Sequence, residues 1–497
     1  MSGVTRRNLL HASAAVGALW VLGAHAQTEP PPSEPLNKRP APTDRRFHSP
    51  AVEEAIARVS KQIADPELAL IFSNCLPNTL DTTVTPGTYR GKPDTFVITG
   101  DIDAMWLRDS SAQVWPYLPF CRKDAKLSSL IEGVIRRQTL CLLIDPYANA
   151  FMPGAHDAPL PWAAHDKTEM KPGVAVRKWE IDSLCYTVRL AHGYWRATGN
   201  TAPFDAAWRQ GAYAIVRTFR EQQRRHGNGP YHFQRKSFIP SASLMLSGYG
   251  NPARPVGLIY SAFRPSDDAC MFPLFIPANF FAVRSLRQLA ELANTVCHDA
   301  ALASDASSLA MEVEAALTRY AQIDSPHGRI WAYEVDGYGN SYRMDDANAP
   351  GLLSLDYLGC VASGDRALFQ RSRSFSLSTD NPYFFRGTAG EGVGGPHKGL
   401  GYIWPMSIIF RAFTSRSTAE TRDCLKTLRD TTAGTHFMHE SFWKDDPDRY
   451  TRPWFAWANA LFGELILALA ANQPALLREA YPRSAQHKEA LTEGSKA

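Results

Sequence analysis

Segments with the periodicity of amphipathic helices recur along almost the whole chain from residue 51 onward, and this recurrence restricts the fold more than any single motif. In these segments apolar residues return every three to four positions, as on one face of a helix. Segments that alternate with the period of a β-strand are few, at 95–99 and 329–344. The helical segments are predicted at 51–72, 110–116, 126–143, 180–198, 203–226, 267–296, 299–322, 346–361, 365–375, 403–414, 417–432 and 454–471.

The loops between alternate helices are long and rich in glycine, proline and aromatic residues, and no internal linker separates the helices. Loops of this length in a compact domain usually carry function. About twelve helices in one domain predict an all-α fold. A ring of paired helices, an (α/α)6 barrel with a few short β-hairpins in its loops, fits this pattern. A helical solenoid is the alternative, although no repeat with a period of about 30–45 residues is visible.

The overall charge is nearly balanced, because 53 Lys and Arg residues face 49 Asp and Glu residues, for a formal net charge of +4. A nucleic-acid-binding protein usually has a concentrated basic face, so no nucleic-acid partner is expected. The long apolar run lies at the N-terminus, so no stable membrane span is expected. The eight cysteines form no CxxC pair, which argues against a zinc site and favours buried free thiols, with one or two disulfides as the alternative.

The N-terminal residues resemble a targeting segment rather than part of the fold. Residues 1–26 contain Arg6 and Arg7, a moderately apolar stretch and a small-residue cleavage site at 24–26. The paired arginines predict a twin-arginine signal peptide, the twin-arginine export machinery as a partner, and a bacterial protein that is periplasmic or secreted. An ordinary export signal is the alternative. Residues 27–50 hold seven prolines and are predicted as a linker, 51–475 as the globular domain and 476–497 as a C-terminal tail.

The segment 99–110 contains three carboxylates, an arginine and a tryptophan. On a structural interpretation, Asp109 or Ser110 caps a helix that begins there and Arg108 pairs with a carboxylate. On a functional interpretation, the segment is a pocket wall. Arg108 and Asp109 would then hold neighbouring hydroxyl groups, and Trp106 would offer a flat apolar face to the C–H side of a ring.

The segment 261–270 contains Arg264 and two adjacent acids, Asp267 and Asp268. Ser266 is a suitable N-cap, and acids in the first turn of a helix are favoured by the helix dipole. Adjacent acids point in different directions, however, so one can enter a cavity while the other bonds Arg264 or backbone amides. A carboxyl group held among aromatic residues has a raised pKa, as a general acid needs.

Two further segments combine polar and aromatic residues. Glu440 lies between His439 and Ser441 in an aromatic loop, a setting that favours a functional role over a surface salt bridge. The glycine-rich segment 381–405 lacks the Lys-Ser/Thr ending of a phosphate-binding P-loop. It is therefore predicted to line a ligand pocket, with these residues exposed to it: His397, Tyr402 and Trp404.

Other kinds of catalytic site are not supported. The run at 345–348 lacks the alternating oxygen ligands of a calcium loop and is better explained by helix capping, so no metal is expected. Serine-hydrolase, zinc-protease and dinucleotide-binding motifs do not occur, and no cofactor is expected. A pair of carboxylates in an aromatic funnel that also contains arginine remains, and these are the groups that glycoside hydrolysis uses.

The chain resembles glycoside hydrolase family 125. The resemblance rests on long blocks between about residues 95 and 465: TGDIDAMWLRDSSAQVWPYL, WEIDSLCY, SAFRPSDDAC, YEVDGYGN, MDDAN, NPYFF with GPH and YIWPMS, and FMHESF with TRPWFAWAN. It implies an (α/α)6 barrel and an exo-acting α-mannosidase that inverts configuration without a metal. The implied substrate is a mannose-containing oligosaccharide or N-glycan fragment, chiefly with α-1,6-linked mannose.

The resemblance also implies roles for individual residues. The general acid falls on Asp267, with Asp268 a close second, and the general base falls on Glu440. The residues expected to bind the terminal sugar are Asp268, Asp103, Trp106, Arg108, Asp109, Arg264, His397, Tyr402, Trp404 and His439.

The predicted mechanism is a single displacement in which Asp267 protonates the glycosidic oxygen and Glu440 activates a water on the opposite face of the sugar. The two carboxyl groups must then be roughly 6.5–9.5 Å apart. One alternative is a periplasmic oligosaccharide-binding protein on an inactive glycosidase scaffold, which would lack the paired acids. Another is a polysaccharide lyase, which would need a Tyr or His base and cations for a substrate carboxylate.

Overall fold

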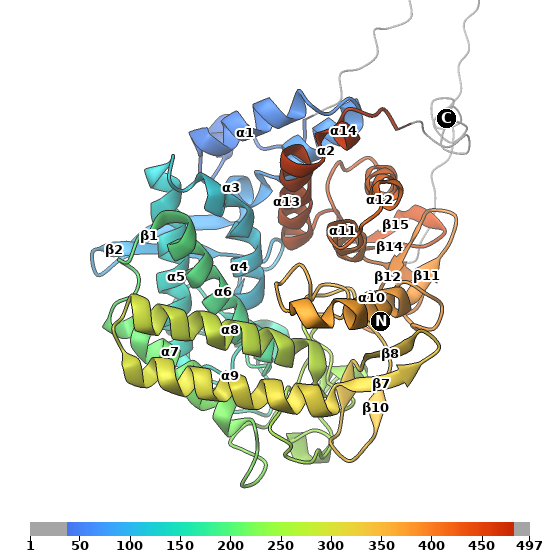
Figure 1. Cartoon of the computed structure of the whole chain (residues 1–497). Coiled ribbons are helices and arrows are strands. Elements are labelled where there is room, and N and C mark those ends of the chain that lie inside the picture. Colours follow the sequence, from blue (N-terminus) through green and yellow to red (C-terminus); the bar gives the residue numbers. More distant parts are fainter. Residues whose placement is uncertain (1–36, 482–497) are drawn as a thin grey trace, which may run out of the picture. The chain divides into compact units, whose positions relative to one another are not determined.

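The structure, a computed structural model, describes residues 37–481, and over this range it is mainly α-helical (Figure 1). The helices are α1 (Pro50–Ser60), α2 (Pro66–Cys75), α3 (Asn78–Thr82), α4 (Leu107–Val114), α5 (Ala125–Ile144), α6 (Ile181–Thr198), α7 (Ala206–Glu221), α8 (Ile276–Thr295), α9 (Ala300–Tyr320), α10 (Arg366–Ser376), α11 (Pro405–Phe413), α12 (Thr418–Asp430), α13 (Ala456–Asn472) and α14 (Pro474–Leu477).

The strands are short and form small antiparallel sheets in the loops between helices. The pairings are β1–β2, β3–β4–β5, β6–β9–β10, β7–β8, β11–β12 and β13–β14–β15. Their bounds are β1 (Val84–Tyr89), β2 (Lys92–Val97), β3 (Met105–Trp106), β4 (Ala150–Phe151), β5 (Val174–Val176), β6 (Leu274–Phe275), β7 (Gln322–Ser325), β8 (Gly328–Trp331), β9 (Glu334–Val335), β10 (Ser341–Tyr342), β11 (Phe384–Arg386), β12 (Glu391–Val393), β13 (Tyr402–Ile403), β14 (Ser441–Trp443) and β15 (Asp446–Thr451).

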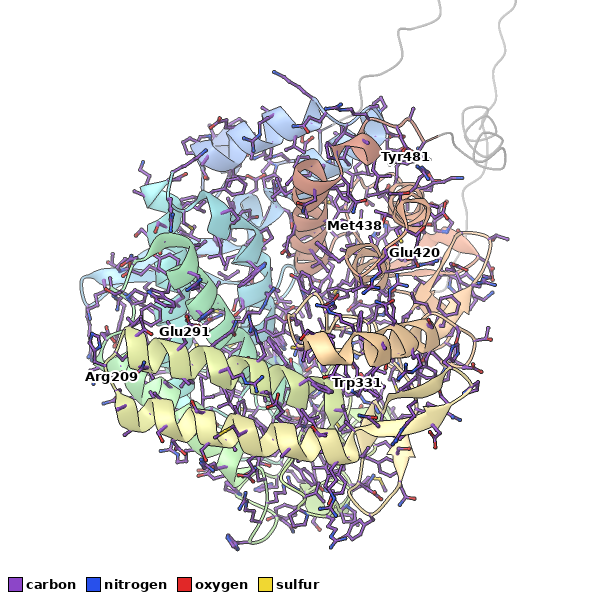
Figure 2. The ribbon with its side chains drawn as sticks, viewed as in Figure 1. Arg209, Glu291, Trp331, Glu420, Met438 and Tyr481 are labelled. Atoms are coloured by element: carbon purple, nitrogen blue, oxygen red, sulfur yellow. The ribbon has the colours of Figure 1, made fainter. Side chains whose placement is uncertain are left out.

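The helices form a series of neighbours, each with a second helix against it. Helix α6 packs between α4 and α8, and α13 packs between α4 and α11. Against this inner series lie α5, α7, α9 and α12, with α9 alongside α8 and α12 alongside α11 (Figure 1). Side chains from both sets form one continuous hydrophobic core, which Figure 2 shows filled across the helices.

The sequence of α13 explains its position in the inner series. Its residues are apolar on all sides, and most of them from Ala456 to Leu469 are buried. A helix that is hydrophobic all round must be covered on all sides. Helix α5, by contrast, begins with an aspartate cap, Asp124, whose side chain accepts the N–H of Leu127.

The segment 267–296 does not form a single helix, and this part of the prediction is wrong. Helix α8 begins at Ile276, so Ser266 does not cap it and the acids at 267 and 268 are not in its first turn. Asp267 has a left-handed backbone with φ +69°, which a helix does not accept. Pro273 and Pro277 lie between this residue and the helix body, and proline favours the first turn of a helix over its interior.

Two other predicted helices differ from the structure. The segment 51–72 is split into α1 and α2, because Asp65 caps a new helix whose first residue is Pro66. The segment 346–361 forms turns rather than a helix. The carboxylate of Asp345 accepts the backbone N–H groups of residues 352 and 353, and these donors are then not available to a helix.

The predicted signal peptide at 1–26 and residues 27–36 of the predicted linker lie outside the described residues. Within the described part of the linker, Arg39 forms ion pairs with Glu53 and, at 2.7 Å, with Asp81, so this end of the chain contacts the helical body. Across residues 37–481, none of the helices combines the length and the apolar character needed to cross a membrane. All eight cysteines fall in this range and are free thiols.

Candidate active site

The candidate residues lie on loops that lead into the inner helices. Residues 99–106 precede α4, 177–180 precede α6, 261–275 precede α8, 394–404 precede α11 and 439–455 precede α13. These helices are neighbours, and ion pairs join their N-terminal loops: Asp101 with Arg452, Lys178 with Asp267, and Lys398 with Glu440. Segments separated by more than 300 residues can therefore form one site.

Arg108 is the centre of a buried ionic cluster. Its Nη1 atom lies 2.6 Å from Oε2 of Glu180 and 3.1 Å from Oδ2 of Asp182. Burial raises the pKa of Glu180 well above its ordinary value, and Arg108 opposes this effect. The helix begins at Leu107 with Trp106 as its N-cap, so Asp109 lies in the first turn and is not the cap. The predicted pairing of Arg108 with carboxylates is thus present.

Asp267 is held by contacts to both its backbone and its side chain. Its carbonyl oxygen accepts a hydrogen bond from Nζ of Lys178 at 2.5 Å, and its Oδ1 accepts one from Nδ2 of Asn149 at 3.1 Å. Burial raises the pKa of Asp267, but the positive charges of Lys178 and then Arg108 outweigh it, so the pKa is lowered. The ionised form is therefore favoured, which is the opposite of what a general acid needs.

Asp268 has different surroundings from its neighbour. Its side chain is 4% exposed, against 30% for the side chain of Asp267. Its Oδ2 atom lies 3.7 Å from Nδ1 of His397 and has no hydrogen bond among the described residues. It also contributes to the field at Asp346, whose pKa is raised by burial first and by this neighbouring acid to a smaller extent.

Glu440 lies between two cations. It is 4% exposed, with Oε2 at 3.0 Å from Nζ of Lys398 and Oε1 at 3.4 Å from Nε of Arg452. Arg452 also forms an ion pair with Asp101 in the loop before α4. The carboxylate is thus connected to two other loops of the candidate site.

The two acid-bearing loops meet at a pair of adjacent residues. His397 contacts Asp268 and Lys398 contacts Glu440. Because consecutive Cα atoms are about 3.8 Å apart, the glycine-rich loop brings the two carboxylates into the same part of the molecule. The pKa of Asp109, which burial raises, also responds to Asp267 and to Arg452. The four segments that carry Asp109, Asp268, His397 and Glu440 therefore lie close together.

Several buried polar atoms in this region have no hydrogen-bond partner among the described residues. Buried polar groups are otherwise almost always paired, so a cluster of unpaired ones indicates a place where a polar ligand binds. Both donors and acceptors are present, as recognition of sugar hydroxyl groups requires. The atoms are Asp268 Oδ2, Asp346 Oδ2, Trp404 Nε1, His439 Nε2 and Tyr333 Oη.

Other predicted sugar-binding residues have contacts of their own. Arg264 is buried and its Nε lies 2.6 Å from Oε1 of Glu334, so it fixes the loop that carries the acids. The ring of His439 stacks on Tyr450 at 3.9 Å, and its Nδ1 donates to the carbonyl of Arg452 at 3.0 Å. These side chains support the loops around the acids.

Among the described residues, no contact joins three of the predicted sugar-binding residues to the candidate acids or to Glu440. Trp106 packs in a small separate cluster with Leu160 and Val176. The hydroxyl of Tyr402 accepts a hydrogen bond from Nε of Arg449 at 3.0 Å. Asp103 is exposed.

Sequence reasoning missed residues that hold the acids in place. Lys178 directly precedes the WEID block and Lys398 directly follows the GPH block, so a basic residue beside a recognised block was the available signal. Asn149 had no such signal, because it lies between a predicted helix and a region without periodicity. Its contact with Asp267 depends on tertiary structure alone.

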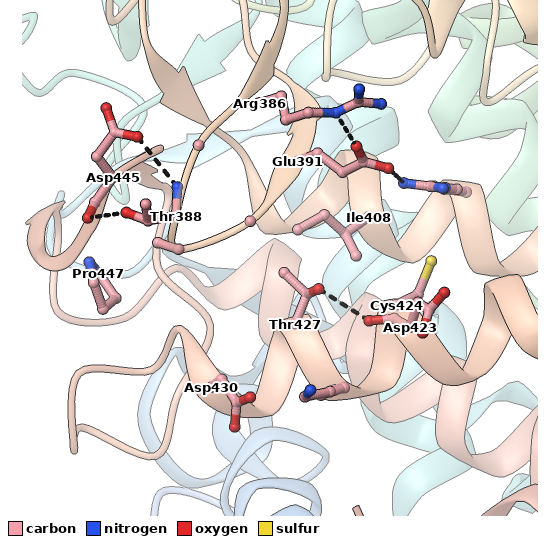
Figure 3. Close-up of a pocket in the computed structure, with 15 residues that line it drawn as sticks. Arg386, Thr388, Glu391, Ile408, Asp423, Cys424, Thr427, Asp430, Asp445 and Pro447 are labelled. Carbon is pink, nitrogen blue, oxygen red and sulfur yellow. Dashed lines mark hydrogen bonds and ion pairs between the residues drawn. The ribbon is translucent and has the colours of Figure 1, made fainter. Parts of the chain in front are cut away.

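A separate pocket of about 780 Å³ lies between the hairpin β11–β12 and helix α12 (Figure 3). Glu391 in this pocket pairs with both Arg386 and Arg411. Neither candidate acid nor the base lines it. This pocket is therefore distinct from the cluster described above.

Two carboxylates on facing loops are the groups that glycoside hydrolysis uses. The sequence model of the family described as metal-independent alpha-mannosidase (GH125) matches residues 65–467. The chain belongs to glycoside hydrolase family 125. The resemblance seen in the sequence blocks is confirmed.

Two similar proteins cover most of the chain. The Meiotically up-regulated gene 157 protein of Schizosaccharomyces pombe is 40% identical over 465 residues, which is 89% of this chain and 90% of that protein. A structure from Streptococcus pneumoniae, a metal-independent α-mannosidase in a non-productive complex with α-1,6-mannobiose, is 37% identical with a TM-score of 0.82, covering 86% of this chain and 100% of that one. A rhamnosidase of Bacillus sp. GL1 shares the fold alone, at 13% identity and a TM-score of 0.50, over 80% of this chain and 34% of that one.

The predicted localisation is wrong. A bacterial periplasmic protein exported by the twin-arginine route conflicts with the fission-yeast relative, which is eukaryotic and matches over 90% of its length. The prediction rested on two adjacent arginines before a moderately apolar stretch. A pattern this short does not define an export route by itself.

Proposed function

We propose that the protein is an exo-acting, inverting α-mannosidase that releases terminal non-reducing mannose, chiefly α-1,6-linked. The observation that carries the proposal is the joining of two buried carboxylates, Asp268 and Glu440, by the adjacent residues His397 and Lys398. The mannobiose bound by the pneumococcal relative supports the choice of sugar and linkage.

An (α/α)6 barrel within the proposed domain 51–475 is the architecture that fits this function. The inner series α11, α13, α4, α6 and α8 supports it, because each of these helices packs on the next and each receives one candidate loop. An inner ring of helices with loops at one end provides a funnel closed around a single terminal sugar, as exo action requires.

The proposed reaction is a single displacement. The acid gives its proton to the glycosidic oxygen while Glu440 takes a proton from a water on the opposite face of the anomeric carbon. The C–O bond to the leaving sugar breaks as the water oxygen attacks, and β-mannose is released. The separation needed is roughly 6.5–9.5 Å, which leaves room for the water.

We assign the acid to Asp268, whereas the sequence blocks favoured Asp267. Lys178 lowers the pKa of Asp267, so this carboxyl group is ionised at a pH where a general acid must hold a proton. Asp268 has a buried, unpaired oxygen and no ammonium group among its contacts. Asp267 then serves to shape the loop and the field around its neighbour.

The test is proton NMR of the first product formed from α-1,6-mannobiose. Early β-mannose supports the proposal, and early α-mannose contradicts inversion. The same digestion of α-1,2- and α-1,3-mannobiose tests the linkage. Unchanged substrate in every case would favour a binding protein instead.

A further inference from the structure

The tip of the glycine-rich loop is a short turn fixed at its base. Gly395 and Gly399 form a β-bridge across it, so residues 396–398 project from the end. A Cβ atom on Gly395 would lie 2.8 Å from Oδ2 of Asp346, so this position accepts only glycine without a shift of its neighbour. Gly399 has φ +84°, a conformation that glycine adopts freely. The backbone geometry at Gly395 and Gly399 therefore determines where residues 396–398 point.

Lys398 is placed by this turn against the candidate base. Its Nζ lies 3.0 Å from Oε2 of Glu440, and its side chain is 25% exposed. Among residues 37–481, Glu440 is the one acid within ion-pair distance of Lys398. Arg452, on the other carboxylate oxygen, is shared with Asp101. Lys398 is thus the cation dedicated to Glu440.

A general base needs a fixed orientation toward its water. Displacement of a catalytic group by about 1 Å can cost roughly 100-fold in rate. Glu440 has two oxygens, each facing a different cation from a different loop. Loss of one cation leaves the carboxylate free to rotate about its terminal bond, because the remaining contact holds only one oxygen.

We propose that Lys398 is a positioning residue for Glu440. We also propose that the turn 395–399 fixes the positions of Glu440 and Asp268 relative to each other, because it holds Lys398 on Glu440 and His397 on Asp268. This inference rests on the proposed function. Lys398 does not need to touch the substrate. Its effect is therefore expected in the chemical step rather than in sugar binding.

The experiment compares Lys398→Met and Lys398→Arg with wild type in steady-state hydrolysis of α-1,6-mannobiose. Lys398→Met is expected to lower kcat about 10- to 100-fold with KM changed less than about 2-fold, because orientation and not binding is lost. Lys398→Arg keeps a cation at this position and is expected to recover most of kcat. Circular dichroism and the thermal midpoint establish that the variants are folded.

Lys444→Met is the matched control. Lys444 is similarly exposed, at 30%, and forms an ion pair with Asp445, but it contacts neither candidate acid nor Glu440. Its variant is expected to match wild type. The proposal is overturned if folded Lys398→Met keeps its kcat, if its loss appears only in KM, or if Lys398→Arg is as impaired as Lys398→Met. Turnover of mannobiose by wild type reports the proposed function separately.

Discussion

The two loops that supply carboxylates to the site hold them in different ways. Before α13, Glu440 carries a cation on each oxygen, from Lys398 and Arg452. Before α8, Lys178 donates a hydrogen bond to Asp267, while the next residue, Asp268, has a buried oxygen without a hydrogen bond. Glu440 thus has a cation on each of its oxygens, whereas Asp268 has only His397 within ion-pair distance. The proposed single displacement assigns different tasks to the two groups, because one donates a proton while the other accepts one.

The largest effect is expected at Glu440, the proposed base. Glu440→Gln removes the proton acceptor but keeps the size of the side chain, so kcat for mannobiose should fall by about 10²- to 10⁴-fold. The thermal midpoint of this variant should stay near that of wild type. Substantial turnover by folded Glu440→Gln would mean that another group activates the water.

The acid assignment is tested by changing the leaving group. Asp268→Asn should lower kcat/KM for mannobiose by about 10²- to 10⁴-fold, because the leaving sugar then departs without a proton. The loss should be far smaller with 2,4-dinitrophenyl α-mannoside, whose leaving group needs no proton. Asp267→Asn should not show this difference between the losses with the two substrates. The reverse pattern would mean that Asp267 is the general acid.

Lys178→Met sharpens the comparison within the acid loop through the pH dependence of kcat/KM. Lys178 lowers the pKa of Asp267, so removing its charge raises that pKa, while Arg108 continues to lower it. A general acid is active while protonated, so a raised pKa would move the alkaline limb of the profile to higher pH if Asp267 were the acid. Because we assign the acid to Asp268, whose interaction with Lys178 is weaker than that of Asp267, only a small shift of the limb is expected.

The smallest effect is expected at Tyr402. Its hydroxyl accepts a hydrogen bond from Arg449 and its ring lies against Trp443, so Tyr402→Phe should change kcat and KM by less than about 2-fold. Kinetics with mannobiose would measure this. A large rise in KM would show that the hydroxyl contacts the sugar, as the sequence suggested.

Much of the helical framework follows from local patterns. The periodicity of 126–143 and 180–198 marks α5 and α6 closely, since their apolar faces repeat without interruption. The segment 267–296 was misassigned at its start because a serine followed by two acids has the same pattern as a helix N-terminus. There the left-handed Asp267 and the following prolines decide the structure.

The sequence suggests candidate site residues where acidic and aromatic residues are concentrated in one segment, as at Asp267, Asp268 and Glu440, and their roles stay a prediction. The residues that tell these acids apart come from other loops. Lys178 reaches Asp267 from the segment before α6, and Asn149 reaches it from the loop between α5 and β4. Their positions depend on how the inner helices pack, and a single sequence does not contain that information locally.

The most direct test of the central claim is the carboxyl separation in a crystal structure of the Asp268→Asn variant with α-1,6-mannobiose bound. The account predicts the side chains of residue 268 and Glu440 on opposite faces of the terminal mannose, roughly 6.5–9.5 Å apart, with a water beside Glu440. A separation near about 5 Å would indicate a covalent intermediate and retention. Glu440 turned away from the sugar would contradict its role as the base.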